Sequence, residues 1–314
     1  MMITVQDFTG VYSEQPFMQE LRTTAETSKD VRWLDCTKIV GTDCYCDDDA
    51  IKEINESIDN AETCGKSECS IENRDNSINA PAIHFFDNGN YHYMSKLWTD
   101  RVQEPFTLIV FDHHPDMQPP RFGGILSCGG WVKEVLDNNK FVQNVIIIGV
   151  KDELVETVRE ELSQSGEASI LEKVTFIKES ELNTLSFQSS LSSLTPSASG
   201  AAVRSYQQIN LPLRHSPGSL LISRLSSQHS LYISIDKDAL APAYAATNWD
   251  QGSLSTEALK ATIADLAANH KIIGIDICGE RSHDFEGSEQ HTIQDADALN
   301  NNLNRELFDF LQKL

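Results

Sequence analysis

Residues 108–116 constrain the fold more than any other stretch of the sequence. Four apolar residues at 108–111 (Leu-Ile-Val-Phe) are followed directly by Asp-His-His-Pro-Asp at 112–116. A short, wholly apolar run of this kind is typical of a buried strand in a parallel sheet. Open α/β sheets place their ligand sites at the carboxyl ends of such strands. Because alternate residues of an extended segment face the same side, we expect Asp112, His114 and Asp116 to converge on one point.

A second segment repeats this pattern far along the chain. Residues 231–235 (Leu-Tyr-Ile-Ser-Ile) form another strand-like run, which ends in Asp236-Lys237-Asp238. A doubly wound sheet would bring the two strand ends side by side, which would give five ligands for two metal ions. Carboxylates combined with imidazole suit zinc, manganese, iron or cobalt. The alternative for either segment alone is an Asp-rich turn after a strand.

The remainder of the chain alternates strands with helices. Further strands are predicted over residues 31–36, 82–87, 142–150, 174–177 and 271–280. This alternation predicts an α/β fold with three layers, α/β/α, and a mostly parallel central sheet. We expect a single domain over 1–314, a peripheral N-terminal arm over 1–30, and a Ser-rich insertion or loop over 186–228.

The composition excludes several classes of partner. The formal net charge is −22, from 25 basic and 47 acidic residues, which argues against a nucleic-acid or anionic-membrane partner. No apolar stretch approaches the roughly 18 residues that span a bilayer, and the first residues lack the pattern of a signal peptide. The seven cysteines are an odd number, so reduced thiols are expected. These features predict a cytoplasmic protein.

Several other polar residues are expected at the same edge of the sheet. His92 lies at a strand-to-helix turn, where a capping or packing role is the alternative to metal binding. Gln118, Asp250 and Glu280 are candidates for substrate contact, and Cys128 is a further one. For Cys128 a small packing role is favoured over a nucleophilic one, because no histidine partner is evident nearby. Cys44 and Cys46, with Cys64 and Cys69, do not have the usual spacing of a structural zinc site.

Taken together, the strand ends resemble those of the arginase and agmatinase superfamily of ureohydrolases. The matching pieces are Gly89-Asn90-Tyr91-His92, Asp112-His113-His114-Pro115-Asp116 and Ser234-Ile235-Asp236-Lys237-Asp238. They occur in the family's order, over roughly residues 80 to 285. The resemblance implies an arginase/deacetylase-like fold, two Mn²⁺ ions per chain and a homo-oligomer, either a trimer or a hexamer.

The resemblance also implies roles for single residues. One ion would be held by His92, Asp112, Asp116 and Asp236, and the other by Asp112, His114, Asp236 and Asp238. Asp116 would also accept a proton during hydrolysis and pass it to the leaving amine. Glu280 is the nearest candidate for the glutamate that contacts the guanidinium group in this family.

The sequence departs from the family mainly where the substrate binds. Cys128-Gly129 stands where arginases have a His-Gly pair, and Glu280 lies one residue later than expected. Ala241-Pro242 stands where the family has Asp-Pro, and residues 247–252 lack its Gly-Thr pattern. The metal ligands therefore carry over better than the substrate contacts.

The expected function is that of a binuclear manganese hydrolase. It would cleave a C–N bond of a guanidino or amidino group and release urea and an amine, with a small molecule or a peptidyl arginine as substrate. One alternative is an amide hydrolase that resembles the single-zinc deacetylases. Another is a non-catalytic metal-binding protein.

Overall fold

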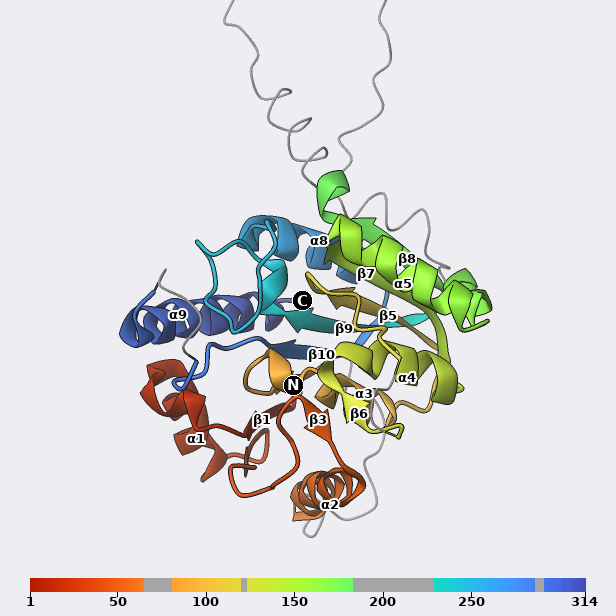
Figure 1. Ribbon diagram of the computed structural model, residues 1–314. Helices are drawn as coiled ribbons and strands as arrows, with labels where there is room; N and C mark the ends of the chain where they lie inside the picture. The colour runs from red at the N-terminus through yellow and green to blue at the C-terminus, as the bar shows by residue number, and fades with distance from the viewer. Residues whose placement is uncertain (65–80, 120–122, 183–228, 286–290) are drawn as a thin grey trace, which may run out of the picture.

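The centre of the protein is a sheet of eight strands, all paired in parallel, in the order β2-β1-β4-β10-β9-β5-β7-β8 (Figure 1). The computed structural model describes residues 1–64, 81–119, 123–182, 229–285 and 291–314. The strands of this sheet are β1 (Ile3–Asp7), β2 (Val31–Asp35), β4 (Ala82–Phe85), β5 (Phe106–Phe111), β7 (Val142–Val150), β8 (Val174–Lys178), β9 (Ser230–Asp236) and β10 (Ile272–Cys278). A separate antiparallel pair joins β3 (Tyr45–Cys46) to β6 (Leu126–Ser127).

Helices cover both faces of the sheet. One face packs against α1 (Pro16–Ala25), α8 (Thr256–Asn269) and α9 (Ile293–Leu311). The other packs against α2 (Asp48–Cys64), α3 (Met94–Thr99), α4 (Trp131–Asn138) and α5 (Asp152–Gln164). Figure 1 shows these two groups of helices on opposite sides of the strands. The predicted three-layer α/β/α architecture is confirmed, with a main sheet that is parallel throughout the described strands.

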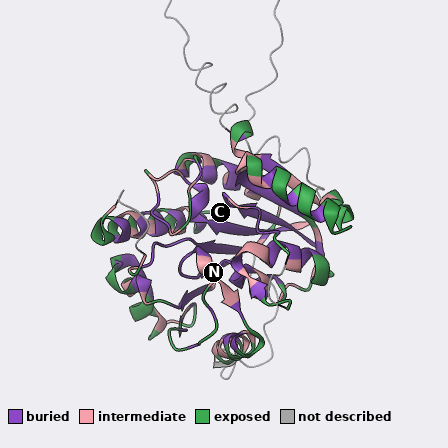
Figure 2. Cartoon of the chain, in the orientation of Figure 1, coloured by how far each residue is buried: buried purple, intermediate pink, exposed green. Residues whose placement is uncertain are grey.

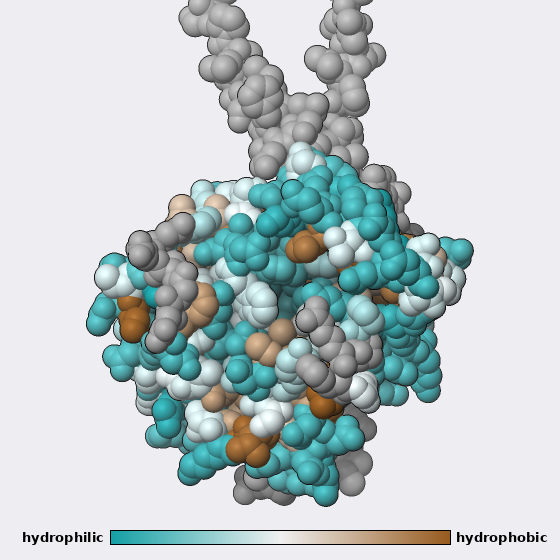
Figure 3. Space-filling view, in the orientation of Figure 1, coloured by the Kyte–Doolittle hydropathy of each residue, from teal (hydrophilic) through white to brown (hydrophobic). Residues whose placement is uncertain are grey.

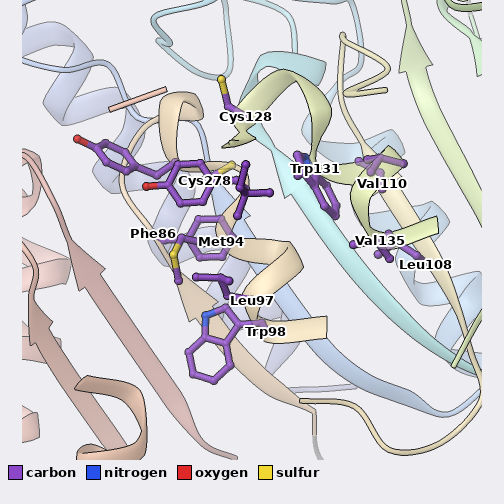
Figure 4. Packing of buried hydrophobic residues seen from close by; sticks show 14 of the residues in the cluster. Phe86, Met94, Leu97, Trp98, Leu108, Val110, Cys128, Trp131, Val135 and Cys278 are labelled. Carbon is purple, nitrogen blue, oxygen red and sulfur yellow. The ribbon is translucent and has the colours of Figure 1, made fainter. Parts of the chain in front are cut away.

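The apolar strands are buried on both faces, and this divides the core into two parts. In β5, Leu108 and Val110 belong to the cluster beneath α2–α5, whereas Ile109 and Phe111 belong to the cluster beneath α1, α8 and α9. In Figure 4, Leu108 and Val110 lie close to Trp131 of α4. Figure 2 shows buried strands between helices whose outward sides are exposed. This two-sided burial explains why the run at 108–111 has no polar alternation.

Two of the helices on one face begin at polar caps. The Ser255 hydroxyl accepts a hydrogen bond from the backbone N–H of Ala258 at the start of α8. The Thr292 hydroxyl does the same for Asp295 at the start of α9. Such caps satisfy N–H groups that have no partner within the helix, and each typically contributes about 1 kcal/mol.

The predicted peripheral arm over residues 1–30 is wrong. Ile3–Asp7 is the buried strand β1, which pairs with β2 on one side and β4 on the other. The following helix α1 buries Phe17, Met18 and Leu21. Even the polar residues Thr4 and Gln6 of this strand are buried. The Ser-rich stretch predicted over 186–228 lies outside the described residues.

The surface is predominantly polar. Figure 3 shows a largely hydrophilic face on which apolar side chains form small, separate patches. Within the described residues, no helix has both the length and the apolar character needed to cross a bilayer.

Candidate metal centre

Four chain segments meet at the carboxyl ends of the central strands. β5 and β9 are neighbours in the sheet, so Asp112 and Asp236 lie at adjacent strand ends, as the sequence predicted. β10 lies on the other side of β9 and places Cys278 beside Asp236. A short 3-10 turn at residues 89–91 follows β4 and carries His92 towards the same edge.

His92 is the centre of the first group of side chains. Its Nδ1 lies 3.1 Å from Asp112 Oδ2, 3.0 Å from Asp116 Oδ2 and 3.6 Å from Asp236 Oδ2. All four residues are buried. One imidazole nitrogen and three carboxylate oxygens therefore surround a common point.

His114 is the centre of the second group. Its Nδ1 lies 2.9 Å from Asp238 Oδ2 and 3.5 Å from Asp112 Oδ1. Asp112 thus belongs to both groups, with one carboxylate oxygen directed at each histidine. The structure brings together all six residues that the sequence predicted as metal ligands.

Each histidine is oriented through its outer nitrogen. His92 Nε2 lies 2.9 Å from Ser234 Oγ, which in turn lies 2.7 Å from Ser95 Oγ. His114 Nε2 lies 2.9 Å from Asp250 Oδ1. Partners of this kind fix the ring so that the other nitrogen faces the metal. Asp250, which the sequence predicted to contact substrate, is placed by the structure against His114 and not among the residues that line the cavity described below.

The crowding of charges shifts the protonation of the whole site. Burial opposes protonation of His92, but its hydrogen bonds to Asp112 and Asp116 raise its pKa well above the usual value. His114 behaves in the same way: burial lowers its pKa, and the carboxylates of Asp112 and Asp238 more than reverse the effect. Burial, together with a neighbouring carboxylate, raises the pKa of Asp236 to about 7 and that of Asp238 to about 6. The site therefore favours added positive charge.

The donor set fits divalent cations. Two groups, His92/Asp112/Asp116 and Asp112/His114/Asp238, each hold three ligating atoms within 4.8 Å of one another. Imidazole and carboxylate donors suit manganese, zinc or iron. A third group within the described chain joins Cys278 to His92 and Asp236. Sequence reasoning missed Cys278, although its place at the end of a strand was a usable signal.

Asp116 is held in a strained conformation. Its φ is +47°, a left-handed value that costs a non-glycine residue of order 1 kcal/mol. Its Oδ2 accepts a hydrogen bond of 2.7 Å from Trp131 Nε1, and its carbonyl accepts one of 3.0 Å from Val132 N. The start of α4 therefore fixes both the carboxylate and the backbone of Asp116. The role of Trp131 could not be seen from the sequence, because it depends on where α4 packs.

A cavity of about 330 Å³ opens over both groups. All six candidate ligands line it, and so do two of the predicted substrate residues, Gln118 and Cys128. The wall also contains Cys44, Tyr45 and Trp249, which the sequence analysis did not assign to the site. A larger hollow of about 680 Å³ lies between α8 and α9, away from these strand ends.

The structure does not bring Glu280, for which the sequence predicted catalytic and substrate-binding roles, to the lining of this cavity. Its carboxylate is 1% exposed and forms a salt bridge with the fully buried Lys237. Gln15 Nε2 and Asn304 Nδ2 donate further hydrogen bonds to it, at 2.9 and 2.8 Å. The oxygens of Glu280 are therefore occupied by the protein itself.

Comparisons with known proteins identify the fold. No protein-family model matches the chain. Its residues superpose on a proclavaminate amidino hydrolase from Streptomyces clavuligerus with a TM-score of 0.56 and 15% identity, over 99% of this chain and 91% of that one. An agmatine ureohydrolase of Thermoplasma volcanium gives 0.55 and 14%, over 99% and 89%. Arginase from Bacillus caldovelox gives 0.53 and 13%, over 96% and 97%.

The chain has the arginase fold. A protein of Thermotoga maritima described as "Uncharacterized protein" is also similar, at 24% identity over 198 residues. This match covers 63% of the chain and 58% of the length of that relative. Within the arginase fold, the candidate ligand Asp236 is the last residue of β9. The other candidate ligands lie in the segments that directly follow the central strands β4, β5 and β9.

Proposed function

We propose that this chain is a metal-dependent hydrolase of the arginase superfamily, which cleaves a C–N bond of a guanidino or amidino group and releases urea and an amine. The observation that carries the proposal is the position of Asp112. Its two oxygens face two separate histidine–carboxylate groups on the floor of one cavity. The ureohydrolase fold of the solved structures described above supports the same reaction class.

In this proposal the cofactor is a pair of Mn²⁺ ions. One would be held by His92, Asp112, Asp116 and Asp236, and the other by Asp112, His114 and Asp238, with Asp236 as a further shared carboxylate. A pair of divalent ions supplies a water of lowered pKa, and therefore a hydroxide nucleophile near neutral pH.

Residues of the chain orient the reacting groups and transfer the proton of the attacking water. Trp131 occupies one lone pair of Asp116 Oδ2 and so fixes the direction of this carboxylate. Asp116 accepts the proton of the attacking water and later gives it to the leaving amine. Ser234 and Asp250 hold the two histidines from behind, so that neither ring can turn away during this transfer.

The cavity wall suits a flat, delocalised cation. Among the described residues, the carboxylates that line it all belong to the candidate ligands, while Gln118, Ser127 and Tyr45 are neutral. Trp249 adds an aromatic ring, 41% exposed, whose Nε1 is anchored by a 3.0 Å hydrogen bond to Asn90 Oδ1. Aromatic faces attract guanidinium groups. With Glu280 occupied by Lys237, this ring is our candidate for substrate recognition.

The test combines metal content with urea release. The full chain is loaded with manganese, freed of unbound metal, and assayed for urea with arginine, agmatine and an arginine-containing peptide. We expect two manganese ions per chain and urea from at least one of these substrates. Asp116→Asn, which keeps the shape of the side chain, should abolish urea release.

The alternatives predict different results. One zinc ion per chain, with acetyl-lysine hydrolysis and no urea, would favour a deacetylase-like amide hydrolase. Two metals without hydrolysis of any of these substrates would favour a metal-binding protein. Lys260→Met, at an exposed ion pair between α8 and α9, serves as the control that should leave metal content and urea release unchanged.

A further inference from the structure

Cys44 and Cys128 face each other across the small antiparallel pair on the cavity wall. β3 pairs with β6 so that Tyr45 is opposite Ser127 and Cys46 is opposite Leu126. Continued by one residue, this register places Cys44 opposite Cys128, and the Cys128 N–H donates to the Cys44 carbonyl at 2.9 Å. Directly opposed residues have Cα atoms about 4.5–5.5 Å apart, which lies within the range that disulfides span.

The two side chains also influence each other's ionisation. The neighbouring Cys128 side chain lowers the pKa of the Cys44 thiol, whereas Cys44, together with burial, raises the pKa of the Cys128 thiol. Cys44 is partly exposed, whereas Cys128 is 9% exposed, and both line the cavity. In Figure 4 the Cys128 sulfur points away from the labelled aromatic side chains below it.

The backbone of Cys44 is unusual as well. Its φ is +57°, one of three left-handed values among the described non-glycine residues; Asp116 is another. Cysteine gains no local hydrogen bond that would favour this conformation, so the surrounding structure must impose it. Such strain persists at sites with a specific task.

We propose that Cys44 and Cys128 form a peroxide-reactive dithiol in the wall of the metal cavity, which closes to a reversible disulfide. The Cys44 thiolate attacks one oxygen of hydrogen peroxide and breaks the O–O bond, so that the sulfur becomes a sulfenic acid and the released hydroxide takes up a proton as water. The Cys128 thiol then attacks the Cys44 sulfur, the S–S bond forms and a second water leaves. The two thiols lose two electrons, and the peroxide gains them.

Three further cysteines whose side chains the structure describes are poor competitors. Burial raises the pKa of Cys36 to about 12 and that of Cys46 to about 12. Cys278 is buried beside Asp236, and both effects raise its pKa well above the usual value. Hydrogen peroxide that enters the cavity should therefore react with Cys44 first, because the reactivity of a cysteine increases with its thiolate fraction and its exposure.

The disulfide would join β3 to β6 covalently beside the candidate ligands. The two sulfur atoms would be drawn to about 2.05 Å from each other. This contraction would draw the two edges of the cavity wall together. It needs no metal, so the proposal stands independently of the proposed hydrolase function.

The experiment treats the reduced full chain with stoichiometric hydrogen peroxide, in buffer that contains a chelator to suppress reactions of free iron. The products are digested without reduction and analysed by mass spectrometry. We expect a cross-linked pair of peptides that contain Cys44 and Cys128, and the loss of two free thiols per chain. Dithiothreitol should restore both thiols.

Matched variants distinguish the role of Cys44, which reacts with peroxide, from that of Cys128, which closes the disulfide. Cys128→Ser should leave Cys44 as a sulfenic acid that reacts with dimedone, whereas Cys44→Ser should prevent fast oxidation at Cys128. Cys36→Ser should form the same disulfide as the unmodified chain. A principal cross-link between Cys44 and Cys46, or equal oxidation of Cys128 in the presence and absence of Cys44, would overturn the proposal.

Discussion

Lys237 and Glu280 form a salt bridge in which neither side chain reaches the solvent: Lys237 is 0% and Glu280 1% exposed. Lys237 stands between two candidate ligands, and Glu280 follows the neighbouring strand β10. The pair therefore ties the ends of β9 and β10 together directly behind the candidate metal centre.

Removal of one partner of this pair should be costly. Lys237→Met leaves Glu280 buried without a cation, and we expect a loss of about 3–5 kcal/mol in the free energy of unfolding. Urea denaturation of the metal-free protein measures it. The double variant Lys237→Met/Glu280→Gln should recover much of this loss. Lys260→Met, which breaks a partly exposed pair with Glu306, should cost less than about 1 kcal/mol; equal costs at the two sites would refute the argument.

Because Asp112 belongs to both groups, its substitution should remove more metal than the substitution of a ligand that belongs to one group. Asp112→Asn weakens a ligand common to both groups, so the variant should retain less than one manganese ion per chain. Asp238→Asn affects the group around His114, and one ion should remain with His92. Metal analysis after gel filtration distinguishes the two variants. Identical metal content in both would show that Asp112 is not shared.

Asp250 should influence metal affinity although it lies behind the ligand. Asp250→Ala frees His114 Nε2, so the ring loses its fixed orientation. Partners of this kind typically contribute 10–100-fold to metal affinity or activity, about 1.4–2.7 kcal/mol. Manganese titration followed by calorimetry measures the change. Asp152→Ala, at the exposed start of α5, is the control and should leave the titration unchanged.

Asp87 should make the protein less stable as the pH rises. Its side chain is fully buried, and this burial raises its pKa to about 7, against 3.8 for the ordinary group. The folded state thus retains a proton that the unfolded state has released. The stabilisation from this proton is complete below about pH 4 and is lost as the pH rises through 7.

The variant Asp87→Asn isolates this effect. Asn tolerates the left-handed φ of +55° found at this position and cannot titrate. Between pH 6 and 8, the unmodified protein should lose about 1.4 kcal/mol more in the free energy of unfolding than the variant does. Denaturant unfolding in the presence of a chelator, at both pH values, checks this. If the free energy of unfolding changed equally with pH in the two proteins, the pKa of Asp87 would lie well below 6.

Trp249 should affect substrate affinity more than turnover. In the proposed hydrolase, Trp249→Ala removes the aromatic face from the cavity wall, and we expect KM for a guanidino substrate to rise about 2–5-fold, as for an exposed cation–π contact of 0.5–1 kcal/mol. Trp249→Phe should retain most of the affinity, and kcat should change little in both variants. A fall in kcat with unchanged KM would assign Trp249 a different role.

The architecture, and the gathering of the six candidate ligands at one edge of the sheet, could be predicted because they depend on local patterns. Residues 142–150 were predicted as a strand and form β7 with the same bounds. The apolar runs before Asp112 and Asp236 end up as neighbouring strands, as expected from two similar strand ends in a parallel sheet. Chemistry placed directly after a buried strand needs little tertiary information to be recognised.

The arrangement of the side chains around the substrate could not be predicted from the sequence, because it depends on how distant segments of the chain align with each other. Glu280 seemed free to bind a guanidinium group until the pairing of β10 with β9 placed it against Lys237. Trp131 reaches Asp116 only because α4 packs beside β5. The N-terminal strand was missed for a related reason: the polar residues Thr4 and Gln6 are buried only once β1 lies between β2 and β4 in the assembled sheet.

The candidate ligands all come from the ends of strands in the middle of the sheet or from the turns just beyond them, and none from its outer strands β2 and β8. Substitutions over most of the molecule therefore need only preserve apolar volume and helix or strand periodicity. A specific chemical requirement falls on the strand ends and on the few side chains that hold them, such as Ser95 and Trp131. A protein with this architecture can replace most of its sequence and keep the fold, as the 13–15% identity to solved arginase-fold structures shows. Changes in the cavity wall can then exchange one substrate for another, while the strand ends that form the cavity floor stay the same.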